Sequence, residues 1–202
     1  MSTFNFRDNE ICIKVVYVGP ALGGKTTNVE RLHQLLPVTV RSDLRMVKTD
    51  EDRTLFFDFF TLDLPLINGM KTRISITGVP GQPFYRATRR AALSGVDGLV
   101  FVADSQHERA TDNQESLEDI TTLLQERHLD IKEMPLVFQW NKRDLPDIMS
   151  PADLNALLNP RGLPAIEAIA IENRGVSEAF KAVVKLIVAR MTRDKSTMRG
   201  GN

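Results

Sequence analysis

The chain has 202 residues and balances 26 basic side chains against 26 acidic ones. This length fits one domain, and the neutral balance excludes a charge-based argument for nucleic acid or an anionic membrane as the main partner. The single cysteine, Cys12, excludes an internal disulfide, and we find no signal peptide, lipidation motif or membrane-spanning apolar run. We therefore expect a cytoplasmic, monomeric protein without a direct membrane anchor.

Apolar runs alternate with segments of helical period, which is typical of a parallel α/β sheet. The pattern predicts strands at 12–18, 98–103, 135–140 and 166–171. It predicts helices at 25–36, 115–127 and 176–191, and one that opens at Ser150. Asn68-Gly69, between apolar runs at 55–66 and 71–76, predicts a tight β-hairpin. We expect one domain over 1–202, with an N-terminal extension at 1–10 and a disordered tail at 193–202.

A phosphate-binding motif follows the first predicted strand and opens the first predicted helix. Residues 19–26 read GPALGGKT and match the pattern G-x-x-x-x-G-K-[ST]. In such a loop, backbone N–H groups and the helix N-terminus face the phosphates, Lys25 reaches the β- and γ-phosphates, and Thr26 places its hydroxyl on Mg²⁺. The predicted nucleotide-binding residues here are Gly19, Ala21, Gly23, Gly24, Lys25, Thr26 and the adjoining Thr27.

A second motif, Asn141-Lys142-Arg143-Asp144, follows the strand at 135–140 and indicates which base is read. The carboxylate of Asp144 can accept two N–H bonds from guanine, whereas adenine lacks the matching donors. We expect Asn141 to tie this loop to the phosphate loop and the Lys142 stem to lie along the base. Because ligands of open α/β sheets bind at the carboxyl ends of the strands, the position of the motif supports a guanine-nucleotide site.

With both motifs in this order, the chain resembles Ras-like small GTPases over almost its whole length. Residues 19–28, 49–58, 79–82 and 100–106 are similar to the MglA family of bacterial gliding-motility GTPases. The resemblance implies a three-layer α/β P-loop domain, with a mostly parallel sheet of about six strands and one antiparallel hairpin. It also implies GTP/GDP and Mg²⁺ as ligands, a roadblock-type activator resembling MglB, polarity effectors, a role in cell polarity or surface motility, and recruitment to the cell pole through partners.

The same resemblance assigns roles to single residues. Arg53 is the built-in arginine that neutralises charge on the transferred phosphoryl group, and Gln82 orients the attacking water. Thr54 lies near Mg²⁺ and the γ-phosphate, Gly81 belongs to the second switch loop, and Ala170 offers a backbone N–H to guanine. The strand that follows Thr54 is expected to shift register with nucleotide state.

Two positions depart from this pattern. Gly78 stands where Ras-like proteins have the Asp of D-x-x-G, which holds Mg²⁺ through water, and Ala21 stands where the family generally has Gly. Because small displacements are costly in phosphoryl transfer, we expect hydrolysis to be slow or to depend on an activator. Three alternatives stay open: a degenerate GTPase-like interaction protein without hydrolysis, a phosphotransfer enzyme such as a nucleotide kinase, and an interaction module that keeps only the fold.

Overall fold

A computed structural model of the chain describes residues 3–5, 9–47, 57–67 and 70–199. Its strands are β1 (Thr3–Asn5), β2 (Glu10–Val18), β3 (Arg45–Val47), β4 (Phe57–Ile67), β5 (Met70–Gly78), β6 (Gly98–Asp104), β7 (Leu136–Asn141) and β8 (Ala165–Glu167). Its α-helices are α1 (Lys25–Leu35), α2 (Arg86–Ala92), α3 (Ala110–Gln125), α4 (Pro151–Leu158) and α5 (Val176–Arg199). Short 3₁₀ turns lie at Pro83–Tyr85, His107–Arg109 and Ala170–Glu172.

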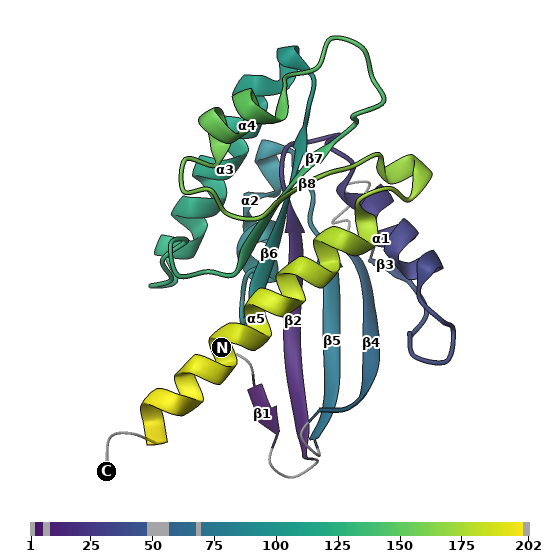
Figure 1. Cartoon of the computed structure of the whole chain (residues 1–202), viewed down its shortest axis with the longest axis vertical. Coiled ribbons are helices and arrows are strands. Elements are labelled where there is room, and N and C mark those ends of the chain that lie inside the picture. Colours follow the sequence, from purple (N-terminus) through teal and green to yellow (C-terminus); the bar gives the residue numbers. More distant parts are fainter. Residues whose placement is uncertain (1–2, 6–8, 48–56, 68–69, 200–202) are drawn as a thin grey trace.

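The strands form one sheet in the order β3-β4-β5-β2-β6-β7-β8, with β1 paired to β2 (Figure 1). The pairs β2–β5, β2–β6, β6–β7 and β7–β8 are parallel, whereas β4 runs antiparallel to β5 as the hairpin signal predicted. The predicted α/β P-loop architecture is confirmed. The short antiparallel strands β1 and β3 were not predicted, because three residues are too few to show a period.

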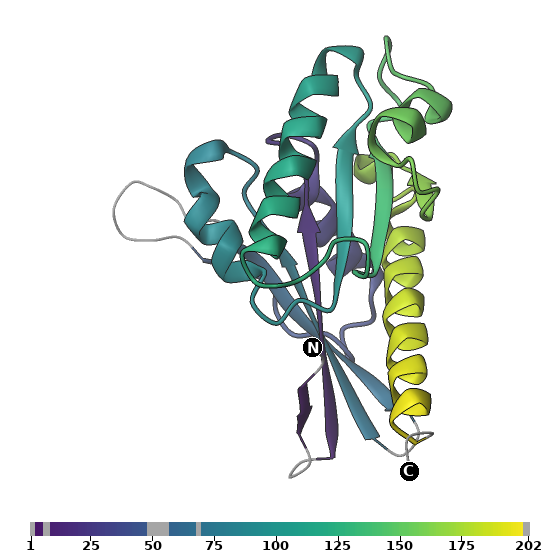
Figure 2. The same ribbon diagram turned by 90° about the vertical axis from the view of Figure 1, so that its left-hand side faces the viewer.

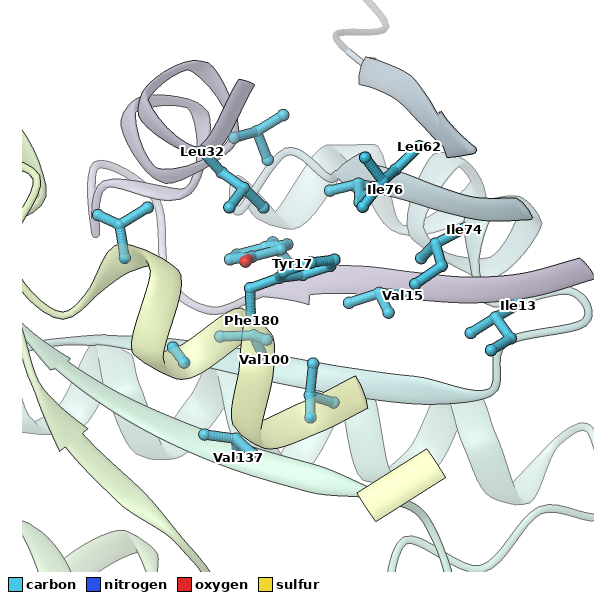
Figure 3. Packing of buried hydrophobic residues seen from close by; sticks show 14 of the residues in the cluster. Ile13, Val15, Tyr17, Leu32, Leu62, Ile74, Ile76, Val100, Val137 and Phe180 are labelled. Atoms are coloured by element: carbon cyan, nitrogen blue, oxygen red, sulfur yellow. The ribbon is translucent and has the colours of Figure 1, made fainter. Parts of the chain in front are cut away.

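Helices cover both faces of the sheet, which gives three layers (Figure 2). One core joins the sheet to α1 and α5, and its largest fully buried side chains include Tyr17 and Phe60. Figure 3 shows Tyr17 between Leu32 of α1 and Phe180 of α5. The opposite core joins the sheet to α2, α3 and α4 around Trp140. The central strands are buried on both sides, which explains their continuous apolar runs.

Some element boundaries differ from the prediction. β8 ends at Glu167 and not at residue 171, because the chain then turns through the bridge between Ile169 and Arg174. α5 continues past the predicted end at residue 191 through 193–199, which we had expected to lie in a disordered tail. No Gly or Pro interrupts this stretch before Gly200.

The other boundaries are close to those predicted. α3 begins earlier, at Ala110, and α4 has the predicted Ser150 cap, whose hydroxyl accepts the N–H of Asp153 at 3.1 Å. Within the described ranges, no helix is long and apolar enough to cross a membrane.

Candidate functional site

A pocket of about 280 Å³ opens where β2 and β5 end and β4 begins. It lies at the carboxyl edge of the parallel strands, where α/β proteins bind ligands. Several predicted site residues line it, together with Asp58 and Gly78, which the sequence had not assigned to binding. The lining residues are Ala21, Leu22, Gly24, Lys25, Thr26, Thr27, Asp58, Gly78, Val79, Pro80, Gly81 and Gln82.

The phosphate loop turns directly out of β2 into α1. Gly24 caps α1 in a left-handed conformation with φ of 100°, and a Cβ there would lie 2.2 Å from Asn141 Nδ2, so only glycine fits. Gly19 and Gly23 lie against the carbonyl of Val102 in β6. The loop is therefore clamped between a central strand and the base-reading motif.

Lys25 is buried at the floor of this loop. Its ammonium donates to the carbonyls of Gly19 and Pro20 at 3.0 and 2.5 Å. Burial, assisted by the nearby Arg89 guanidinium, lowers the pKa of Lys25 from 10.5 to about 7, and the Asp58 carboxylate opposes the shift. This amine is a poorly solvated cation, and phosphate oxygens would compensate its charge.

Asn141, the last residue of β7, joins the two predicted motifs. Its Nδ2 donates to the Gly23 carbonyl at 2.9 Å, and its Oδ1 accepts the backbone N–H of Ala170 at 3.0 Å. The predicted tie between the base loop and the phosphate loop is thus present. The N–H of Ala170, which the resemblance offered to guanine, is used by Asn141 in this structure.

The rest of the base-reading motif lies on the same edge. Lys142 has a positive φ of 65° and pairs with the buried carboxylate of Asp104 at 2.6 Å. Asp144 is exposed, as a residue that reads a ligand's edge must be. Arg143 points away from this motif: it pairs with Glu167 at 3.0 Å and donates to the Met149 carbonyl at 2.6 Å.

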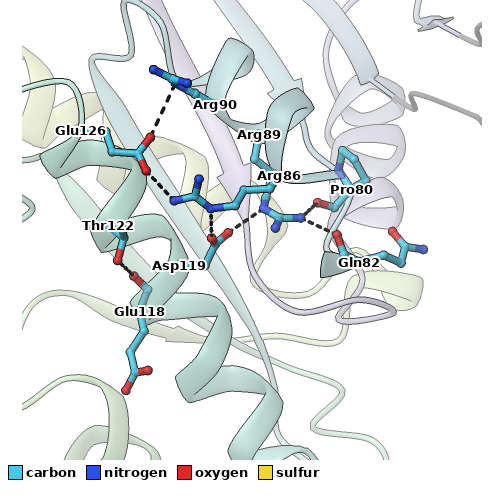
Figure 4. A network of polar contacts seen from close by, with 9 residues as sticks. All are labelled: Pro80, Gln82, Arg86, Arg89, Arg90, Glu118, Asp119, Thr122 and Glu126. Carbon is cyan, nitrogen blue, oxygen red and sulfur yellow. Dashed lines mark hydrogen bonds and ion pairs between the residues drawn. The ribbon is translucent and has the colours of Figure 1, made fainter. Parts of the chain in front are cut away.

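The second switch loop packs against the phosphate loop. A Cβ at Gly81 would lie 2.3 Å from the backbone nitrogen of Ala21, so the two backbones touch. Arg89 of α2, which is buried, donates to the carbonyls of Pro80 and Gln82 at 3.2 and 2.6 Å (Figure 4). The same guanidinium pairs with Asp119 of α3 at 2.8 Å, which anchors the loop to α3.

Asp58 is the functional residue that motif reading missed. It lies at the start of β4, its side chain is buried, and it lies close enough to the Thr26 hydroxyl for that group to favour its charged form. Burial raises the pKa of Asp58, while Thr26 and Lys25 oppose the shift. Carboxylate and hydroxyl oxygens are ligands that Mg²⁺ accepts, so the residues at this point fit the ion. The sequence carried no signal for Asp58, because its pairing with Gly78 depends on the register of the hairpin, which shifts between Leu64 and Ile67.

Two predicted residues, Arg53 and Thr54, lie outside the described residues. The structure brings the others to one edge of the sheet: the phosphate loop, Gly81 and Gln82 line the pocket, and Asn141 connects Lys142, Asp144 and Ala170 to it.

Comparison with known proteins agrees with this geometry. Residues 3–187 match the Arf, or ADP-ribosylation factor, family. The chain is 44% identical over 191 residues to the mutual gliding-motility protein MglA of Myxococcus xanthus, which covers 95% of this chain and 98% of that protein. It is 29% identical over 130 residues to the Ras-related protein SEC4 of Saccharomyces cerevisiae, covering 64% of this chain and 58% of SEC4. It is also 25% identical over 190 residues to the Ras-related protein RABA5a of Arabidopsis thaliana, covering 93% and 78%.

Proposed function

The chain belongs to the Arf family of small GTPases, and we propose that it is a GTP/GDP-controlled switch with slow intrinsic hydrolysis. One observation carries the proposal: Asn141 bonds to both Gly23 and Ala170, so a phosphate loop and a guanine-reading loop share one rigid support. The Lys25 ammonium is also buried in the phosphate loop, and a loop that served only the fold would have no need of this charge.

The residues divide the work of holding the nucleotide. Lys25 would exchange its two carbonyl partners for phosphate oxygens, which compensate its charge better in a buried position. Asp144 would accept the two N–H groups of guanine, and the Lys142 stem would cover the base. Thr26 would hold Mg²⁺, and Thr54 would contribute from the first switch segment. When bound, the ion would supply positive charge that offsets the negative charge of the phosphates.

Hydrolysis depends on the switch side of the pocket. Gln82 would orient the attacking water and Arg53 would neutralise charge on the transferred group. In this structure the Gly81 backbone lies directly against Pro20 and Ala21, which leaves the loop that carries Gln82 little room beside the phosphate loop. This contact supports a slow reaction that an activator accelerates.

The similarity to MglA extends the proposal to partners and process. We propose control of surface motility or cell polarity, a roadblock-type activator resembling MglB, and recruitment to the pole through that activator or an effector. A second candidate, a GTPase-like interaction protein without useful turnover, is favoured by the close packing of Gly81 on Ala21.

The decisive experiment measures the nucleotide released from denatured purified protein, and then turnover of GTP with Mg²⁺. Bound GDP with measurable turnover supports a hydrolysing switch, whereas bound GTP without turnover supports the interaction protein. Lys25→Ala should release the nucleotide, while Lys185→Ala, an exposed change on α5, should not. A wild-type protein that neither contains nor binds guanine nucleotide would contradict the proposal.

A further inference from the structure

The pocket contains one buried carboxylate that no motif accounts for. Asp58 is 3% exposed, lines the pocket and faces two polar groups of the phosphate loop. It lies close enough to the Thr26 hydroxyl and to the Lys25 ammonium for both groups to favour its charged form. Burying a charged carboxylate costs free energy unless nearby positive charge compensates it, so we expect Asp58 to have a cationic partner in the pocket.

The strand register explains why this carboxylate can stand in for a missing one. Asp58 and Gly78 are directly paired across the antiparallel β4–β5 hairpin. Paired residues of an antiparallel sheet project their side chains to the same face, so a side chain at position 78 and that of Asp58 would share one space. The neighbouring Thr77 alternates to the other face and pairs with Phe59.

The atoms around position 78 also show that a side chain there would approach Asp58. A Cβ built on Gly78 would lie 3.5 Å from Asp58 Oδ2 and 3.6 Å from Asp58 Cβ. The nearest atom to that Cβ is Val29 Cγ2 of α1, at 3.2 Å. Two carboxylates at positions 58 and 78 would repel each other, so glycine avoids both this repulsion and the tight contact with Val29. The D-x-x-G carboxylate that is missing from position 78 is therefore matched by one that reaches the same space from the adjacent strand.

A pairing with Lys25 alone does not explain all the contacts of Asp58. In P-loop proteins the metal is held by the hydroxyl of the phosphate loop and by an acidic residue from a neighbouring strand. Asp58 lies beside that hydroxyl in Thr26 and lines the same pocket.

We propose that Asp58 supplies, from β4, the carboxylate that holds the Mg²⁺ of the bound nucleotide together with Thr26, in place of the acidic residue absent at Gly78. The role rests on the nucleotide switch proposed above. It makes Asp58 a metal-positioning residue, since it acts through the ion and need not touch the nucleotide.

The test compares release of a fluorescent GDP analogue in Mg²⁺ and in EDTA. In the wild type, Mg²⁺ should slow release. Asp58→Asn keeps the size of the side chain but should weaken apparent Mg²⁺ affinity by about tenfold to hundredfold, with release in EDTA unchanged. The matched control is Asp63→Asn, the same change on the same strand, where the carboxylate is exposed and pairs with Arg73 at 2.7 Å.

A rescue variant makes the test specific. Asp58→Asn/Gly78→Asp restores a carboxylate to the same space from β5 and should recover most of the Mg²⁺ effect. Asp58→Glu keeps the negative charge beside Lys25 but moves the carboxylate by one methylene, so the Mg²⁺ effect should be reduced even if Asp58→Asn does not fold. Thermal unfolding with and without nucleotide identifies variants that fold.

Each outcome decides between the claims. Full Mg²⁺ dependence in Asp58→Asn, or in Asp58→Glu if only that variant folds, would overturn the metal role and leave the switch intact. A wild type that binds nucleotide with no Mg²⁺ effect would overturn it as well. A wild type that binds no guanine nucleotide in either condition would remove the proposed function and this inference together.

Discussion

The two sides of the pocket are built in different ways. On the framework side, buried side chains bond to backbone groups of several segments: Asn141 joins Gly23 to Ala170, and Gln139 joins Asn28 of α1 to the Gly175 carbonyl before α5. On the switch side, the loop after β5 is attached to α3 chiefly through Arg89, which contacts two loop carbonyls and Asp119.

The difference teaches which side can change with a ligand. The hydrogen bonds of the framework side connect the ends of the central strands to the segments where helices begin. Breaking one of them leaves buried polar groups without partners. The switch loop has backbone contact with Ala21, and its first residue, Val79, donates its N–H to the Tyr17 carbonyl of β2 at 3.2 Å. We therefore expect a bound ligand to move the switch side, because its rearrangement costs less free energy than that of the framework side.

The largest effect is expected on the framework side. Asn141→Ala removes both bonds of the connecting amide and leaves Gly23 and Ala170 without them, so guanine-nucleotide affinity should fall by about a hundredfold or more. Titration with a fluorescent GDP analogue measures it. Asn155→Ala on α4, which also loses side-chain bonds but far from the site, should keep its affinity. Equal losses in both variants would mean that the effect is general destabilisation.

A change on the switch side should alter stability more than nucleotide binding. Arg89→Ala removes the bonds to Pro80, Gln82 and Asp119, so the free energy of unfolding should fall by about 1–3 kcal/mol while GDP affinity changes little. Chemical denaturation measures the first quantity. Arg90→Ala, an exposed neighbour with a 3.6 Å contact to Glu126, is the control and should change the free energy of unfolding by less than about 0.5 kcal/mol. A large loss of GDP affinity in Arg89→Ala would erase the contrast between the two sides.

The contact between the two sides should limit hydrolysis. Ala21→Gly removes a methyl group from the pocket that Gln82 also lines and loosens the backbone on which Gly81 packs, so GTP turnover should rise by roughly tenfold. Single-turnover hydrolysis measures the rate. Ala91→Gly, an exposed change in α2, serves as control. An unchanged rate in Ala21→Gly would place the limit elsewhere, for example in Arg53 or the metal.

The smallest effect is a proton taken up on binding. Burial, with Arg89, holds the pKa of Lys25 near 7 in the nucleotide-free fold, below its value of 10.5 in the unfolded chain. Stability of the nucleotide-free protein should therefore rise with pH between these two values, because the unfolded chain binds more protons there.

Phosphates favour the charged amine, so GDP binding should take up a fraction of a proton above pH 7 and less below it. Calorimetry in buffers of different ionisation enthalpy measures the uptake, and Arg89→Ala should move its onset to higher pH. No uptake at pH 8 would contradict the pKa shift.

The framework side was largely predictable from the sequence. Its binding residues lie in two contiguous motifs, residues 19–26 and 141–144. Each motif directly follows an apolar run that is easily recognised as a strand. Ala170 was assigned by resemblance alone; its N–H bonds to Asn141 in this structure, and the strand before it ends sooner than predicted.

The switch side was not predictable in the same way. The role of Asp58 depends on which residue of β5 it faces, and register across a hairpin cannot be read from either strand alone. Arg89 had no motif around it, and its three partners come from two segments that are far apart in the sequence. Ion pairs between a loop and two helices emerge only when the fold brings them together.

Trp140, the one indole of the chain, gives the framework a spectroscopic signature. It is fully enclosed in the core beside Phe138 and directly precedes Asn141 in β7, and its Nε1 has no hydrogen-bond partner among the residues that the structure describes. Emission from the native protein should therefore be blue-shifted and poorly quenched by iodide, and should move to the red when this strand unfolds. Since the switch loop contains no tryptophan, the intrinsic fluorescence of unlabelled protein should follow unfolding of the framework side and should not respond to movement of the switch loop.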